Sequence, residues 1–176
     1  CFASNGMLFN DESTRRGENF ISRKVIIGII KILKGYQKCL YLGNLKSKRD
    51  WGHAKEFVDA QWKILQYKTP DDFVIATGKN YSVKDLVNLV LKKLKIKYLW
   101  KKDKKGYEYA LAQNDIGQIK KSQIIIKQEK IYFRPNEVHN LVGDYRKATK
   151  LLKWKPKIKF DRLISEMIDS DLKNII

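Results

Sequence analysis

The sequence predicts an α/β fold, and three observations support this. Short apolar runs typical of buried parallel strands recur, as at residues 2–9 and 73–76. Longer segments between them carry apolar residues at helical spacing, as at 54–65. The chain has 176 residues and 43% hydrophobic content, enough for one domain with a core. Because strands that alternate with helices build a sheet covered by helices, we expect an α/β architecture.

The first half of the chain is expected to alternate strands and helices. Apolar runs mark the strands, and Gly35 ends the first helix. The expected elements are a strand at 2–9, a loop at 10–18, a helix at 20–33, a strand at 40–42, a polar loop at 44–50 and a helix at 54–65. The expected inward stripe of the last helix is Ala54, Phe57, Val58, Trp62 and Leu65.

The second half continues the alternation. Ser82, followed three residues later by Asp85, is typical of a helix start. The expected elements are a strand at 73–76, a helix at 83–94, two strands around a charged excursion at 95–132, a short helix at 146–152 and a final helix from 160 onward. We find no internal repeat or low-complexity linker.

The positive charge of the chain is high but scattered. The net charge is +18 at pH 7 and the pI is about 9.8. Most basic residues are Lys, and no expected helix carries a one-sided Arg stripe. Because nucleic-acid-binding surfaces concentrate their charge, we expect solvated lysines rather than a nucleic-acid interface.

Residue usage argues against several other classes. Cys1 and Cys39 are too few for a disulfide scaffold, which favours a reducing, cytoplasmic setting. His53 and His139 stand alone, so we expect no metal site. We expect neither a membrane span nor a signal peptide. The chain begins with Cys1 rather than Met, so we expect a fragment.

The stretch "LFNDESTRRGENFISRK" (residues 8–24) is a candidate anion site. Ligands bind beyond the carboxyl ends of strands in open α/β sheets, and the paired guanidiniums of Arg15 and Arg16 suit phosphate. Arg23 and Lys24 could add a second contact. The residues leave an alternative open, a loop in which acidic neighbours neutralise the Arg pair: Asp11, Glu12 and Glu18.

Two further stretches suit nucleotide recognition. In "YLGNLKSKRDWGH", Gly43 allows close approach of a ligand, Asn44 can read a base or ribose, and Arg49 can bind an anion. In "YFRPNEV", Arg134 precedes a proline and Glu137 can accept ribose hydroxyls. A β-turn explains the first stretch and a structural Arg–Glu pair the second, and both alternatives remain open.

No proton-transfer centre is evident. The chain has no Gly-rich turn after its first strand and no Ser–His–Asp order. Tyr98 and Lys102 have Tyr-x-x-x-Lys spacing but lie in a strand-like pattern, where that spacing does not align them as one helical turn would. We therefore expect recognition of a nucleotide diphosphate, with no catalytic residue in this chain.

In order along the chain, these segments resemble the carboxy-terminal half of the GDP-mannose 4,6-dehydratases, which are extended short-chain dehydrogenases/reductases. The matching stretches are "FASNGMLFNDESTRRGENFISRK", "CLYLGNLKSKRDWGHAKEFVDAQW", "DDFVIATG", "YFRPNEV" and "KATKLLKWKPKIKFDRLISEMIDSDL". The resemblance implies a cytoplasmic, NADP-using hydro-lyase that converts GDP-mannose to GDP-4-keto-6-deoxymannose and forms homodimers or homotetramers. The family's cofactor fingerprint and its catalytic Thr, Glu, Tyr and Lys would precede Cys1. An alternative is another nucleotide-sugar dehydratase or epimerase, or a basic nucleotide- or nucleic-acid-binding module without catalysis.

The resemblance also assigns site residues. The implied substrate-binding residues are Asn10, Lys24, Gly43, Asn44, Arg49, Arg134 and Glu137. The implied cofactor-binding residues are Asp11 and Arg16. The family has His where this chain has Asp11, and a carboxylate there would repel a pyrophosphate.

The implied division of the chain has two parts. Residues 1–18 would end the cofactor-binding sheet and form the ligand loop. Residues 19–176 would mainly form the substrate domain, with 53–78 returning to the cofactor-binding domain.

Overall fold

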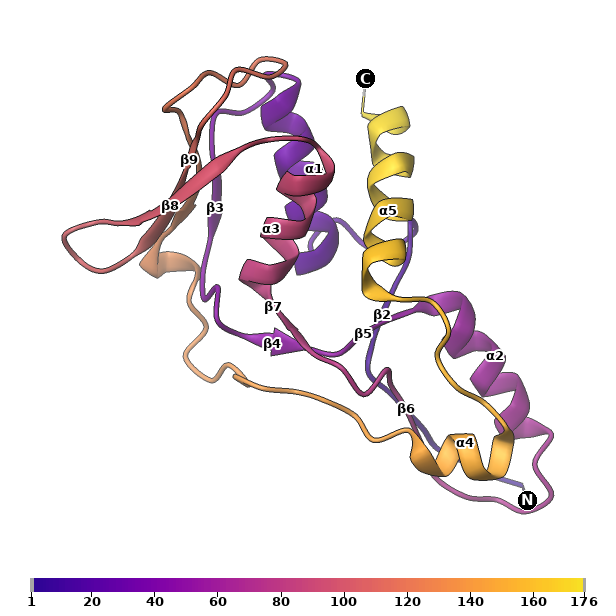
Figure 1. The fold of residues 1–176 in the computed structure, drawn as a ribbon. Coiled ribbons are helices and arrows are strands. Elements are labelled where there is room, and N and C mark those ends of the chain that lie inside the picture. The colour runs from indigo at the N-terminus through magenta and orange to yellow at the C-terminus, as the bar shows by residue number, and fades with distance from the viewer. Residues whose placement is uncertain (1, 176) are drawn as a thin grey trace.

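The structure is a computed structural model that describes residues 2–175 (Figure 1). Its helices are α1 (Ile21–Leu33), α2 (Ala54–Leu65), α3 (Val83–Lys93), α4 (Arg146–Leu152), α5 (Phe160–Asn174) and a 3-10 turn, η1 (Lys130–Tyr132). Its strands are β1 (Gly6–Leu8), β2 (Asn10–Glu12), β3 (Leu40–Leu42), β4 (Lys48–Arg49), β5 (Trp51–His53), β6 (Phe73–Ile75), β7 (Tyr81–Ser82), β8 (Tyr98–Lys102), β9 (Glu108–Ala112) and β10 (Ile124–Gln128).

The strands form one larger sheet and three pairs. The larger sheet has the order β3-β10-β9-β8, in which β3 and β10 are parallel and the other neighbours antiparallel. The pairs β1–β6 and β2–β5 are parallel, and β4–β7 is antiparallel. Figure 1 shows the larger sheet at one end of the molecule and β6 with α2 and α4 at the other.

Two apolar cores correspond to these two ends. The larger core joins α1, α3 and α5 to the four-stranded sheet, and the smaller one joins α2, β6 and the region of α4. Trp51 stacks on Phe160 with ring centroids 5.4 Å apart, so α5 is fixed beside β5 in the larger core. The smaller core is centred on Trp154, whose indole packs edge-on against Phe57.

The predicted α/β class is confirmed, and the helix at 54–65 has the predicted bounds. The capping box of Ser82 and Asp85 is also confirmed: each side chain bonds the backbone N–H of the other. The loop predicted at 10–18 is wrong in its first three residues, which form β2. The polar loop predicted at 44–50 likewise contains β4. Both short strands arise from pairing with distant segments, which local sequence pattern does not reveal.

The predicted inward stripe of α2 is wrong for three of its members. Val58, Trp62 and Leu65 are 62%, 59% and 66% exposed. The buried residues of this helix are Phe57, Ala60 and Ile64. Phe57, Ala60 and Ile64 belong to the smaller core, whereas Val58, Trp62 and Leu65 face away from it.

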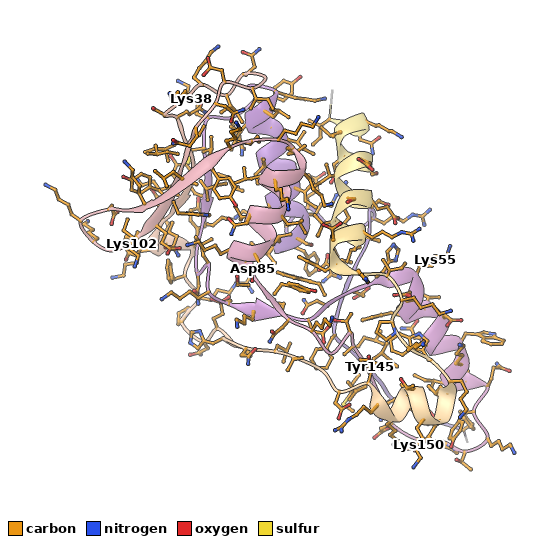
Figure 2. All side chains as sticks on the ribbon, viewed as in Figure 1. Lys38, Lys55, Asp85, Lys102, Tyr145 and Lys150 are labelled. Atoms are coloured by element: carbon orange, nitrogen blue, oxygen red, sulfur yellow. The ribbon has the colours of Figure 1, made fainter. Side chains whose placement is uncertain are left out.

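The lysines are distributed over the whole molecule. Figure 2 shows Lys38, Lys102, Lys55 and Lys150 in four separate regions, from the sheet end to α4. Within residues 2–175, no helix has the length and apolar character needed to cross a membrane. The same residues contain no group of three or more His, Cys, Asp or Glu side chains placed to hold a metal ion.

Candidate functional site

A cavity of about 650 Å³ lies between α1, the end of β3 and the irregular segment that follows η1. All seven residues predicted to bind substrate line it: Asn10, Lys24, Gly43, Asn44, Arg49, Arg134 and Glu137. They come from four separate parts of the sequence, so the fold brings them together. The two predicted cofactor residues, Asp11 and Arg16, are outside this lining.

Lys24 is the cation that α1 contributes to the cavity. Its ammonium lies 4.9 Å from the centroid of the Tyr132 ring. Among the described residues, no carboxylate lies within 4 Å of this ammonium, whereas Arg23 beside it is paired with Asp171 at 2.9 Å. The pKa of Arg23 is raised, chiefly by this hydrogen bond. Lys24 is therefore available to an anion. Arg23, which the sequence also offered as a second phosphate contact, is instead paired with Asp171 on α5.

Gly43 and Asn44 form the floor of the cavity at the end of β3. A Cβ on Gly43 would collide with the backbone carbonyl of Tyr132. The close approach predicted for a ligand is thus made by the protein's own backbone. The Oδ1 atom of Asn44 accepts a hydrogen bond from the Lys46 N–H at 2.9 Å, which leaves the amide NH₂ to donate.

Arg49 and Glu137 face each other, with Nη2 and Oε1 3.5 Å apart. Nη1 of Arg49 also donates to the carbonyls of Lys48 and Val138. Arg134 is exposed and has no acidic partner among the described residues. The Arg134–Glu137 pair considered from the sequence does not form, because Glu137 pairs with Arg49.

The Arg pair of the first loop has two different environments. The guanidinium of Arg16 lies 3.6 Å from the Phe20 ring centroid and 3.5 Å from both Asp11 and Glu12. For Arg16 the structure thus has the salt-bridged arrangement that the sequence left open. Arg15 makes no ion pair within residues 2–175. Nε of Arg16 is buried and makes no hydrogen bond to any residue that the structure describes, and the atom it faces is Oε2 of Glu12 at 3.5 Å.

Glu12 is the buried carboxylate at the end of β2. Its side chain is 1% exposed and accepts a hydrogen bond of 2.5 Å from the Ser22 hydroxyl. Burial raises its pKa to about 6, against the opposing effects of Ser22 and Arg16. This group anchors the loop to the start of α1.

Asp50 and Tyr132 were missed by the sequence analysis. Asp50 is fully buried and accepts hydrogen bonds from the backbone N–H groups of Thr77, Gly78 and Gly143, and from the Thr77 hydroxyl. It therefore ties three segments together beside Arg49. A usable indication was present in the sequence, since an acid between an arginine and an apolar strand needs hydrogen-bond partners.

Tyr98 and Lys102, with their Tyr-x-x-x-Lys spacing, lie on β8 outside the cavity lining.

The overall fold matches a solved structure that contains a nicotinamide cofactor. It aligns with RMD from Pseudomonas aeruginosa, complexed with NADPH, at a TM-score of 0.73 and 15% identity, over 97% of this chain and 48% of that chain. The fold is that of the Rossmann-like extended short-chain dehydrogenases/reductases, as predicted, and the chain is a partial domain of it.

The sequence comparison is more specific. Residues 1–167 match the family model described as GDP-mannose 4,6 dehydratase. The chain is 44% identical to GDP-mannose 4,6 dehydratase 2 of Caenorhabditis elegans over 97% of its length, and 42% identical to the human GDP-mannose 4,6 dehydratase over 98%. The chain belongs to the GDP-mannose 4,6-dehydratase family. It spans 43% and 44% of the length of these two relatives.

Proposed function

We propose that this chain is the substrate-binding part of a GDP-mannose 4,6-dehydratase, a hydro-lyase that converts GDP-mannose to GDP-4-keto-6-deoxymannose and water. The observation that carries the proposal is the single cavity lined by all seven residues implied by the family resemblance. Its cations and hydrogen-bonding groups suit a nucleoside diphosphate joined to a sugar.

The residues divide between the two ends of such a ligand. Lys24 and Arg134 carry positive charge with no acidic partner within residues 2–175, so we assign them to the diphosphate. The free NH₂ of Asn44 can donate to O6 or N7 of guanine, both of which are acceptors. Glu137 is assigned to the ribose hydroxyls.

Two further residues support these contacts. Arg49 was predicted to bind phosphate, but its bonds to two carbonyls and Glu137 suit it to orienting that carboxylate. Asn10 lies on β2 at the cavity edge and is assigned to the diphosphate or sugar.

We propose NADP as the nicotinamide cofactor. Arg16 lies just beyond the carboxyl end of β2, which is parallel to β5, where a ligand of an open α/β sheet is expected, and its guanidinium suits a phosphate although it is ion-paired with Asp11 and Glu12. Asp11 fits less well, because its carboxylate both repels a pyrophosphate and neutralises Arg16. We therefore assign cofactor contact to Arg16 and expect Asp11 to weaken it. The cofactor would supply hydride acceptance and return, and the residues of this chain would hold and orient the nucleotide sugar.

The division predicted from the sequence is part of the proposal. β1 and β6 would end the cofactor-binding sheet, residues 53–78 would return to that domain, and the remainder would form the substrate domain. The assignment to the carboxy-terminal half stays a prediction. Reading the DNA immediately upstream of Cys1 tests it, since an in-frame Tyr-x-x-x-Lys is expected there. We also propose a cytoplasmic homo-oligomer.

Ligand competition tests the function. The complete gene product should bind GDP-mannose, and GDP should compete better than UDP or dTDP. Lys24→Met should weaken GDP binding, whereas Lys38→Met, on an exposed lysine remote from the cavity, should not. Stronger competition by UDP or dTDP would instead identify another nucleotide-sugar enzyme. Salt-dependent DNA or RNA binding without any effect of GDP-mannose would favour the basic module.

A further inference from the structure

Tyr132 connects two sides of the cavity that are far apart in sequence. Its ring lies under the ammonium of Lys24, which comes from α1. Its backbone carbonyl lies against Gly43, at the end of β3. Tyr132 is 46% exposed, so its ring is not part of an apolar core.

The backbone around Tyr132 is pinned to β3. The Glu129 N–H donates to the Leu42 carbonyl at 3.0 Å, and the Gln128 side chain donates to the Gly43 carbonyl at 2.9 Å. The Tyr132 N–H closes the 3-10 turn on the Glu129 carbonyl at 3.1 Å. The backbone that carries the ring is therefore fixed relative to β3.

A lysine ammonium that is held by an aromatic ring keeps a charge available to a ligand, whereas one that is held by a carboxylate does not. Lys24 has a long flexible side chain, and ordering it when the ligand binds would cost affinity. A carboxylate would order it but would compete with phosphate. An aromatic face attracts the ammonium through its quadrupole and leaves the positive charge uncompensated.

We propose that Tyr132 is a positioning residue, whose ring holds the Lys24 ammonium in the cavity for the diphosphate of the ligand. This inference rests on the proposed function, because it assumes that a nucleoside diphosphate occupies the cavity. It adds a residue to the site and assigns it a role that acts through Lys24.

The test compares GDP with guanosine, since only GDP carries the groups that Lys24 would contact. Affinities of both ligands are measured by calorimetry for the complete gene product and for Tyr132→Leu, Tyr132→Phe and Tyr36→Leu. Tyr36 is a matched control, an exposed tyrosine outside the cavity lining. Tyr132→Leu should lower the affinity for GDP about 3- to 10-fold, which is the range expected for a partly exposed cation–π contact. The affinity for guanosine should change by less than about 2-fold. Tyr132→Phe keeps the ring, so its affinities for both ligands should stay within about 2-fold of those of the unsubstituted protein.

Three results would overturn the inference. If Tyr132→Leu lowered the affinities for GDP and guanosine equally, Tyr132 would only line the cavity and would not act through Lys24. Failure of Tyr132→Phe to retain GDP affinity would assign the effect to the hydroxyl. Unchanged GDP affinity in Tyr132→Leu would remove the role altogether. In each case the unsubstituted protein still binds GDP, so the proposed function stands; absence of GDP binding to that protein would reject both proposals.

Discussion

Gly43 and Tyr132 are in direct backbone contact, and no side chain fits between them. Gly43→Ala should therefore displace the segment that carries Arg134 and Glu137. Overpacking of this kind lowers the unfolding free energy by about 1–3 kcal/mol. Because the displaced segment carries two of the cavity residues, GDP affinity should also fall, on the order of 10-fold. Calorimetric titration with GDP measures this loss.

The control for that substitution is Gly6→Ala. A Cβ at Gly6 would have its nearest neighbour, the Ile64 side chain, at an ordinary 3.4 Å. GDP affinity should be unchanged. Equal affinities of the two alanine variants would show that the Gly43–Tyr132 contact does not shape the cavity.

Asp50→Asn should destabilise the protein strongly. One oxygen that accepts N–H groups becomes an NH₂ that faces them, and the site is fully buried. The cost of unsatisfied buried donors predicts a loss of about 2–4 kcal/mol in unfolding free energy, measured by urea denaturation.

Asp144→Asn is the matched comparison for Asp50. Its carboxylate is exposed and pairs with Arg146 at the surface. The urea midpoint should hardly move. A similar shift in both variants would contradict the role of Asp50 as a buried acceptor for three backbone N–H groups.

Glu12→Gln should change how stability depends on pH. Because burial raises the Glu12 pKa from 4.5 to about 6, the native state binds this proton more tightly than the unfolded chain. The stabilising contribution is present below pH 4.5 and is lost as pH rises through 6. The unfolding free energy of the original protein relative to Glu12→Gln should fall by about 2 kcal/mol over this interval.

Denaturant unfolding at several pH values from 4 to 7 provides the measurement. Taking the difference between the two proteins cancels the contributions of groups that the substitution does not touch. A constant difference would mean that Glu12 has an ordinary pKa in the native state.

The 176-residue chain prepared alone should self-associate. β1 is paired on one edge, with β6, and its residues Met7 and Leu8 are 52% and 37% exposed. Open strand edges and exposed apolar faces favour aggregation. Size-exclusion chromatography should show large species, and Met7→Lys should reduce them. A monodisperse, cooperatively melting sample of the unmodified chain would refute this expectation.

The sequence predicted the parts of the molecule that depend on local pattern. Helix α2 follows from its apolar spacing, and the start of α3 from Ser82 and Asp85. Residue chemistry made six of the seven cavity residues candidates, with structural alternatives left open, and the family resemblance added Asn10 and assigned all seven to the substrate. What failed depended on distant partners, such as the pairing of β2 with β5 and the identity of the covered face of α2.

The site shows the same division. Arg49 and Glu137 were both predicted, but their mutual pairing joins segments far apart in the chain. The role of Gly43 was predicted as ligand approach, whereas only the structure shows that Tyr132 lies against it. Residue type predicts chemical capacity, and the fold decides which partner uses it.

The cavity takes Asn10 and Lys24 from the first elements of the chain and Arg134 and Glu137 from a segment near its other end. During synthesis, no ligand-binding site can exist until that late segment has emerged and docked on β3. Slow, non-local closure of this kind makes the site one of the last features to form. A nucleotide sugar would then bind preferentially to the completely folded chain, because a chain without the docked late segment lacks the contacts of Arg134 and Glu137.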